Sequence, residues 1–178
     1  MKAAYQPIDR WSIPQGAVDV TLQGLRIAGA SGNEGGALWL GERGSTARVL
    51  VVALPRGPGV VERPGIWQMS TGVYAQVGVW AATQSVVLLA LVHSHRSTRA
   101  NYLSELDKFA SVHVPDFLSI VVGGFGADLR PKDWGFHVFE HDRFKRLSQV
   151  AVANRISIQD GSVRSVECDE RGVRTLGV

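Results

Sequence analysis

The chain has 178 residues, of which 45% are hydrophobic and 20% charged. This length and composition predict one globular domain, residues 1–178, with a sizeable core, and argue against a second domain. The net charge is only +3, and lysine and arginine form no long run, so we expect no nucleic-acid partner. The densest basic cluster, residues 143–146, is interpreted as the solvated face of a helix or turn.

Cysteine usage and apolar patterning bear on the compartment. A single cysteine, Cys168, excludes an internal disulfide and fits a reducing compartment, and we expect it to pack inside a C-terminal strand. The N-terminal residues lack the apolar stretch of a signal peptide. The longest apolar run, residues 86–92, is far shorter than the roughly 20 residues of a membrane helix. These features predict a cytoplasmic protein without a membrane span.

The first half of the chain alternates between helical and strand patterns. Apolar residues recur at helical spacing over 18–28, before a glycine-rich stop at 29–33. Residues 37–40 and 47–54 are predicted to form two neighbouring strands. The turn-rich stretch 55–64 is a candidate for a mobile flap or for a plain surface connection.

The second half continues the alternation. We predict helices over 71–82 and 101–112, and buried strands over 85–92, 117–122 and 134–139. Together with the first half, this order indicates an α/β fold.

Two glycine-containing motifs could mark a phosphate loop or a tight turn. Gly123 to Gly126 superficially suggests a phosphate loop, but Pro131 and Asp133 follow it instead of a helix N-terminus. Residues 155–158 and 162–166 flank an Asp-Gly pair, which predicts a C-terminal β-hairpin.

Metal-capable and catalytic side chains occur together at fixed spacings. His93 and His95 end the predicted strand 85–92, and side chains two apart on a strand point the same way. Ser104 and Asp107 share one exposed flank of the predicted helix that follows. Two imidazoles and a carboxylate suit a catalytic Zn²⁺ ion, with a fourth position left for water. An upstream acid, Glu34, opens a short apolar strand and is a candidate general base.

This arrangement resembles the signature of the JAMM (MPN+, JAB1/MPN/Mov34) metalloprotease family. That signature pairs E-x-x-x-L-x-x-G with H-x-H-x(7 to 10)-S-x-x-D, and every position is filled here. The resemblance covers roughly residues 18–139. It implies a JAMM/MPN (cytidine-deaminase-like) fold, in which helices flank a mixed, curved β-sheet. One departure is Arg96, which stands where many members have proline, and it bears on the loop conformation and on nearby substrate contacts.

The resemblance also implies a role for each residue of the motif. His93, His95 and Asp107 would bind one Zn²⁺ ion. Glu34 would act as the general base, and Ser104 would steady the oxyanion or the attacking water. A zinc metallo-isopeptidase with such residues would cleave the amide bond after the C-terminal glycine of a ubiquitin-like protein. Its partners would then include that protein or its conjugate, together with activating- and conjugating-type enzymes of a bacterial pathway such as antiviral defence.

Two other functions stay open at this point. One is the release of a small amino acid from a sulfur-carrier-type protein by the same chemistry. The other is a non-catalytic MPN scaffold, against which the complete signature argues.

Each part of the motif also has an ordinary structural interpretation. Ser104 and Asp107 match a helix capping box. Glu34 taken alone would be a solvated residue at a loop-to-strand junction, and a His-x-His pair occurs by chance. It is their joint order and spacing that favours a site. The remaining histidines are expected to be structural or surface residues, and they are His113, His137 and His141.

Overall fold

The computed structural model describes residues 6–99, 101–127 and 130–176. Its helices are α1 (Gln15–Ala30), α2 (Thr71–Thr83), α3 (Glu105–Ala110) and α4 (Gln149–Arg155), with short 3-10 turns at Gly124–Gly126 and Pro131–Asp133. The strands are β1 (Arg10–Pro14), β2 (Gly36–Glu42), β3 (Thr46–Pro55), β4 (Val60–Arg63), β5 (Ile66–Met69), β6 (Val87–Ser94), β7 (Leu118–Val122), β8 (Gly135–Glu140), β9 (Arg143–Arg146), β10 (Ile156–Gln159), β11 (Arg164–Asp169) and β12 (Gly172–Thr175).

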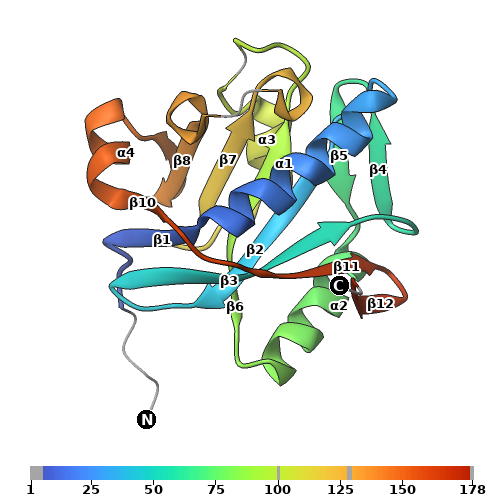
Figure 1. Cartoon of the computed structure of the whole chain (residues 1–178), viewed down its shortest axis with the longest axis horizontal. Coiled ribbons are helices and arrows are strands. Elements are labelled where there is room, and N and C mark those ends of the chain that lie inside the picture. Colours follow the sequence, from blue (N-terminus) through green and yellow to red (C-terminus); the bar gives the residue numbers. More distant parts are fainter. Residues whose placement is uncertain (1–5, 100, 128–129, 177–178) are drawn as a thin grey trace.

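Ten of these strands form one mixed, curled sheet, in the order β10-β1-β3-β2-β6-β7-β8-β9 with β11 and β12 attached through β3 (Figure 1). Strand β3 is long enough to pair in parallel with β1 near its start and with β11 near its end. At the centre of the sheet, β6 lies antiparallel to β2 and parallel to β7. Strands β4 and β5 form a separate hairpin. The architecture is therefore a mixed α/β fold, as the sequence predicted.

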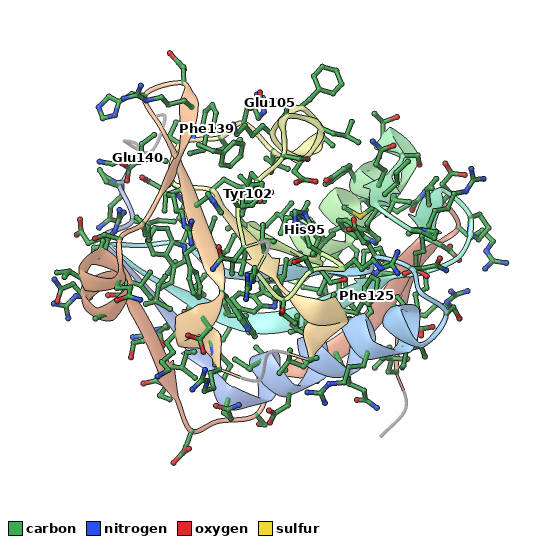
Figure 2. All side chains as sticks on the ribbon, turned by 90° about the horizontal axis from the view of Figure 1, so that it is seen from above. His95, Tyr102, Glu105, Phe125, Phe139 and Glu140 are labelled. Carbon is green, nitrogen blue, oxygen red and sulfur yellow. The ribbon has the colours of Figure 1, made fainter. Side chains whose placement is uncertain are left out.

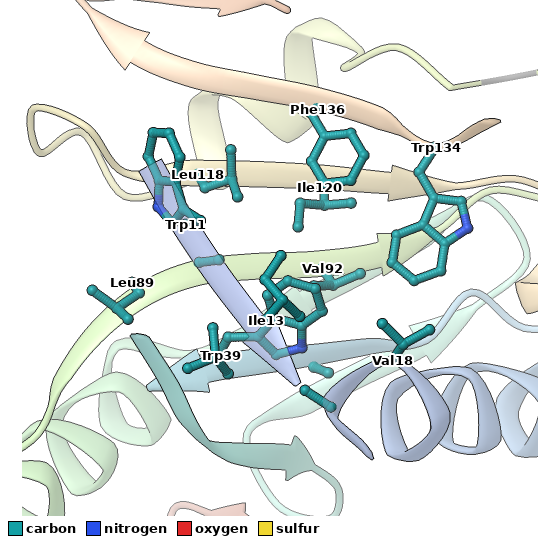
Figure 3. Close-up of a cluster of buried hydrophobic side chains, with 14 of the residues drawn as sticks. Trp11, Ile13, Val18, Trp39, Leu89, Val92, Leu118, Ile120, Trp134 and Phe136 are labelled. Atoms are coloured by element: carbon teal, nitrogen blue, oxygen red, sulfur yellow. The ribbon is translucent and has the colours of Figure 1, made fainter. Parts of the chain in front are cut away.

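Helix α1 covers one face of the sheet. Its apolar stripe packs on a cluster that includes Trp11, Trp39 and Phe136 (Figure 3). Fully burying a large aliphatic or aromatic side chain contributes about 1.5–3 kcal/mol, so this cluster dominates the stability of that face. The Trp39 indole N–H donates to Thr21 Oγ1 of the helix at 2.8 Å, which fixes α1 over β2.

Helix α2 covers part of the opposite face. Ser70 caps its N-terminus by accepting a hydrogen bond from the Val73 backbone N–H. The buried side chains of α2 contact the apolar residues of β2, β3 and β6 on this face, including Leu38 and Leu91. His93 is on the same face because residues 91 and 93 share one side of β6, and His95 continues this alternation just past the end of the strand.

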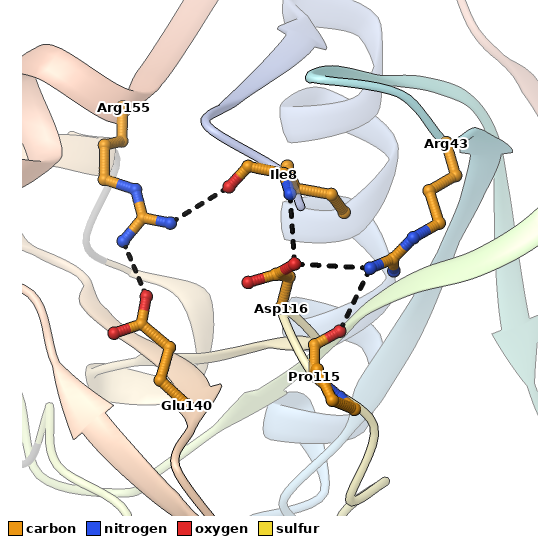
Figure 4. Close-up of polar contacts among 6 residues, drawn as sticks. All are labelled: Ile8, Arg43, Pro115, Asp116, Glu140 and Arg155. Carbon is orange, nitrogen blue, oxygen red and sulfur yellow. Dashed lines mark hydrogen bonds and ion pairs between the residues drawn. The ribbon is translucent and has the colours of Figure 1, made fainter. Parts of the chain in front are cut away.

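A polar network ties the N-terminal segment to the rest of the sheet (Figure 4). The buried carboxylate of Asp116 accepts from the Ile8 backbone N–H at 3.0 Å and lies 3.3 Å from Arg43 Nη2. Arg155 donates to the Ile8 carbonyl at 3.1 Å and pairs with Glu140 at 2.9 Å. These contacts hold β1 in place between β3 and β10.

The C-terminal strands also brace the loop that leads to the β4–β5 hairpin. The Arg56 backbone N–H donates to the Cys168 carbonyl at 2.9 Å, and the Glu170 N–H donates to the Pro58 carbonyl at 3.1 Å. The Ser70 hydroxyl donates to Glu170 Oε1 at 2.6 Å. Residues on both sides of the hairpin are thus anchored to β11 and to the turn after it.

Several predicted elements differ from the structure. The hairpin expected around the Asp-Gly pair is wrong, because β10 pairs with β1 whereas β11 pairs with β3 and β12. Residues 143–146 form the exposed edge strand β9 instead of a helix or turn. Half of the turn-rich stretch 55–64 belongs to the β4–β5 hairpin.

The predicted helix over 101–112 is shorter than expected, because Ser104 caps α3 and Ser111 is already extended. The apolar spacing that suggested a longer helix does not mark a buried face, since Leu103 is buried ahead of the helix and Leu106 is exposed.

Two further observations concern Cys168 and the apolar character of the helices. Cys168 is fully buried in β11, as predicted. Within the described ranges, no helix combines the length and apolar character that a membrane crossing requires.

Candidate metal centre

Strand β6 positions both histidines. His93 is 3% exposed and is paired with Gly36 of β2. His95 follows the strand, and its backbone N–H continues the ladder by donating to the Val122 carbonyl at 2.9 Å. The His95 carbonyl accepts from the backbone N–H of Phe125 at 3.0 Å, so the loop cannot swing away without losing two hydrogen bonds. In Figure 2, His95 lies between the turn that carries Phe125 and the helix that carries Glu105.

Helix α3 supplies the carboxylate. Asp107 and Ser104 form a complete capping box, in which Ser104 Oγ accepts from the Asp107 N–H at 3.1 Å and Asp107 Oδ2 accepts from the Ser104 N–H at 2.7 Å. The ordinary interpretation of this pair is therefore confirmed. The same geometry turns the Asp107 side chain toward both histidines.

Three potential ligand groups converge on one point. The two imidazole Nε2 atoms of His93 and His95 are 3.1 Å apart. Asp107 Oδ1 is 3.4 Å from His93 Nε2, and Asp107 Oδ2 is 3.2 Å from His95 Nε2. Ligands at 2.0–2.1 Å from a tetrahedral Zn²⁺ ion would be separated by about 3.3 Å, so the spacing fits that ion. This His-His-Asp group can hold a metal ion.

The electrostatics of the group favour a negative charge on Asp107 and a positive charge on His95. Burial opposes ionisation of Asp107, but hydrogen bonds from His93 and His95 outweigh it and hold the pKa of Asp107 well below its usual range. Burial opposes the charged form of His95, yet Asp107 raises the pKa of His95 above its ordinary value. Because metal ligands must be deprotonated, binding of a cation at this point would compete with protonation of His95.

The candidate base, Glu34, is held beside this triad. Gly35 and Ser94 exchange hydrogen bonds, with the Gly35 N–H donating to Ser94 Oγ at 3.0 Å and the Ser94 N–H to the Gly35 carbonyl at 2.9 Å. The Glu34 carboxylate accepts from the backbone N–H of Arg96. Burial raises the pKa of Glu34 against the attraction of His95 and His93. A carboxyl group with a raised pKa is suited to proton transfer near neutral pH.

A narrow cleft of about 290 Å³ opens next to the triad, between the β4–β5 hairpin, α2 and α3. Trp67 of β5 forms one wall, and its ring lies so close to Gly36 that a Cβ there would be 2.4 Å from the indole. Tyr74 of α2 lies at the same cleft, where burial raises its pKa to about 12. The remaining lining residues are Gln68, Met69, Leu91, His93, Asp107, Ala110 and Ser111.

The structure brings all five motif residues to one place, although the sequence did not identify the cleft walls. Trp67 falls just beyond the stretch proposed as a flap, and no local pattern marked it or Tyr74 as site residues.

None of the other three histidines belongs to the triad. His137 is buried in β8, and His141 is exposed with a left-handed backbone. His113 stacks on Phe139, and its Nε2 lies 2.6 Å from the Lys108 carbonyl, as expected for a histidine after a helix C-terminus.

Comparisons with known proteins relate this chain to others through structure. No protein-family model and no curated protein matches its sequence. The solution structure of protein DSY2949 from Desulfitobacterium hafniense is 18% identical and covers 85% of this chain and 94% of its own, with a TM-score of 0.62. The similarity shows a shared fold. AF2198, a JAB1/MPN domain protein from Archaeoglobus fulgidus, is 13% identical over 87% of this chain and 99% of its own, with a TM-score of 0.42.

Proposed function

We propose that this chain is a zinc-dependent hydrolase of amide bonds, with His93, His95 and Asp107 as the metal ligands. The observation that carries the proposal is the separation of 3.1–3.4 Å between the facing ligand atoms, with the buried Glu34 carboxylate alongside. A structural zinc site has four protein ligands, whereas three protein ligands leave a position for chemistry. The resemblance of the motif to the JAMM signature supports the same class of reaction.

The chemistry follows from the placement of two further residues. A zinc ion held by the triad would supply Lewis acidity, lowering the pKa of a water molecule toward about 7 and polarising the scissile carbonyl. Glu34 would accept the proton of the attacking water and deliver it to the departing amine. The Ser104 Oγ accepts from the Asp107 N–H, so its own O–H is left to donate to a developing oxyanion.

The shape of the site favours an extended peptide tail as the substrate. The cleft beside His93 and Asp107 is narrow, which suits glycine better than a residue with a bulky side chain. Strand β5 pairs with β4 along one edge, so its other edge can accept an added strand. We propose on these grounds, and on the JAMM resemblance, that the substrate is the C-terminal tail of a ubiquitin-like protein or of its conjugate.

Metal content and turnover should separate the roles of these residues. Wild type and Glu34→Gln are both expected to contain one zinc per chain by plasma mass spectrometry, with cleavage of a ubiquitin-like protein carrying a C-terminal extension by the wild type alone. His95→Ala should lose zinc and cleavage together. Wild-type protein that takes up no zinc would refute the metal site and favour a scaffold. Zinc-loaded protein that releases a single C-terminal amino acid but leaves longer extensions intact would favour the sulfur-carrier alternative.

A further inference from the structure

Two arginines bracket the candidate base. The Glu34 backbone N–H donates to the carbonyl of Arg63 at 3.2 Å, and the Glu34 carboxylate accepts from the backbone N–H of Arg96. Arg63 ends strand β4, whereas Arg96 directly follows His95, so two distant segments meet at Glu34. Both residues are exposed. Both arginines therefore belong to segments that contact Glu34 through their backbones, and their side chains are open to solvent.

Within the described part of the chain, the guanidinium groups of these two arginines and of nearby Arg99 form no ion pair with an acidic side chain. Among the described residues, Arg63, Arg96 and Arg99 take part in no side-chain ion pair or hydrogen bond, although Arg99 is also exposed on the loop after His95. One unpaired surface arginine is ordinary. Three of them on the two segments next to Glu34 add positive charge near the site, on a chain whose net charge is only +3. We refer to Arg63, Arg96 and Arg99 as the arginine rim.

The position of the cleft indicates which part of a substrate would meet this rim. The cleft is lined by His93 and Asp107, but neither His95 nor Glu34 contributes to its walls. A substrate tail that fills the cleft must therefore continue beyond the triad on the side where His95 and Glu34 lie. A general acid must come within about 3 Å of the nitrogen that it protonates, so the leaving amine passes Glu34 and the segments that carry Arg63 and Arg96.

We infer that this protein selects substrates with acidic residues on the leaving side of the scissile amide, and that Arg63 and Arg96 are the specificity-determining residues, with Arg99 extending the rim. The inference rests on the proposed function, and it specifies the charge of the part of the substrate that follows the scissile amide. Guanidinium groups pair with carboxylates through two parallel hydrogen bonds, which lysine cannot reproduce. Arg96 stands where many JAMM members have proline, and the inference assigns it a role in substrate selection.

A set of three substrates tests the preference. Each carries the same ubiquitin-like domain ending in Gly-Gly, followed by an extension of four Glu, four Ser or four Lys residues. With the zinc-loaded wild type, kcat/KM should be at least about 10-fold higher for the Glu extension than for the Lys extension, mainly through KM. The preference should shrink as salt rises from 50 to 500 mM, since the Debye length falls to a few ångströms.

Charge variants show whether the two arginines cause that preference. The Glu-to-Lys ratio should fall to about 1 in Arg63→Ala/Arg96→Ala and invert in Arg63→Glu/Arg96→Glu. Arg10→Glu is the control, because Arg10 lies on β1, is exposed and also makes no ion pair among the described residues. It should keep the wild-type ratio, which separates a local contact from a change in net charge.

Binding gives a readout that does not depend on turnover. In zinc-loaded Glu34→Gln protein, a fluorescein-labelled Gly-Gly-Glu-Glu-Glu-Glu peptide should bind at least about 10-fold more tightly by anisotropy than its Lys counterpart. Loss of this difference in Arg63→Ala/Arg96→Ala should accompany unchanged zinc content. Equal cleavage and equal binding of the acidic and basic probes would overturn the inference while leaving the proposed hydrolase intact. A wild type that cleaves none of the substrates, but shows the binding preference, would refute the proposed function instead.

Discussion

Asp107 Oδ2 lies 2.7 Å from the Ser104 backbone nitrogen and 3.2 Å from His95 Nε2, so one carboxylate oxygen both begins helix α3 and faces the candidate metal position. Capping and metal binding are therefore not alternative interpretations of the Ser-x-x-Asp motif. The cap fixes the rotamer of Asp107, and the fixed rotamer brings its second oxygen to within 3.4 Å of His93. A six-residue helix with no buried side chain is stabilised largely at this one point.

Substitution of Asp107 should separate these two contributions. Asp107→Asn keeps an oxygen that can cap Ser104 but removes the charge, so we expect lost zinc with little change in the helix. Asp107→Ala should lose zinc and a further roughly 1 kcal/mol of stability, the usual effect of a missing cap. Zinc analysis and urea unfolding of both metal-free variants measure the difference. Glu105→Ala, which removes an exposed ion pair with Lys108, is the control and should retain zinc. Equal stability of the two Asp107 variants would contradict the role of the cap.

Trp67 should matter through its shape and not through its polar atom. Its side chain is buried against Gly36, and its indole nitrogen has no hydrogen-bond partner among the described residues. Trp67→Ala should cost about 3 kcal/mol and abolish cleavage while zinc remains bound. Trp67→Phe keeps most of the packing and leaves no buried donor unpaired, so its stability should stay within about 1.5 kcal/mol of the wild type. A larger loss in Trp67→Phe by urea unfolding would show that the indole nitrogen has a partner in solution.

His137 should make the protein less stable in mild acid. Burial lowers the pKa of His137 from 6.5 to about 4. Between these pH values the unfolded chain binds a proton that the folded chain does not, so its contribution is complete above pH 6.5 and is lost as the pH falls toward 4. The expected loss is up to about 3 kcal/mol. Urea unfolding at pH 7 and 4.5 in the His95→Ala background, with and without His137→Gln, isolates this effect from metal release. An identical pH dependence with and without His137 would contradict the prediction.

Cys168 should report global unfolding. Burial, together with the negative charges of Asp169 and Glu167, raises the pKa of the Cys168 thiol to about 12 from 9. Because the thiolate is the reactive form, the folded protein at pH 8 should react with a disulfide reagent on the order of 1,000-fold more slowly than the urea-unfolded chain. The absorbance of the released thiol gives both rates. Fast modification of the folded protein would mean that β11 opens locally.

Local features of the sequence were enough to predict that His93, His95 and Asp107 converge on one point. The shared face of His93 and His95 follows from strand alternation, and the direction of Asp107 follows from a capping box within four residues. The coarse α/β class and most helix and strand positions follow from short-range apolar spacing for the same reason.

Long-range contacts explain why the C-terminal hairpin was wrongly predicted and why the cleft wall was not predicted. The Asp-Gly signal between β10 and β11 is a local preference, and it is overridden because each strand gains a parallel partner far away in the sequence, β1 and β3 respectively. Parallel pairing leaves no turn signature that a sequence window can detect. Trp67 escaped notice for a related reason, since its role depends on a close approach to Gly36 that only the tertiary structure creates.

The bracing of the hairpin by the C-terminal strands determines when in synthesis the cleft can form. Ser70 and Glu170, which hold the end of the hairpin, are 100 positions apart in the chain. A nascent chain whose residues 93–107 have left the ribosome still lacks β11 and Glu170, so Ser70 at the end of the hairpin has not yet gained its C-terminal anchor. Closing contacts of such high sequence separation is slow and comes late in folding. The candidate metal triad would therefore form before the cleft beside it is braced, so that the candidate site is completed only when the last strands have been made.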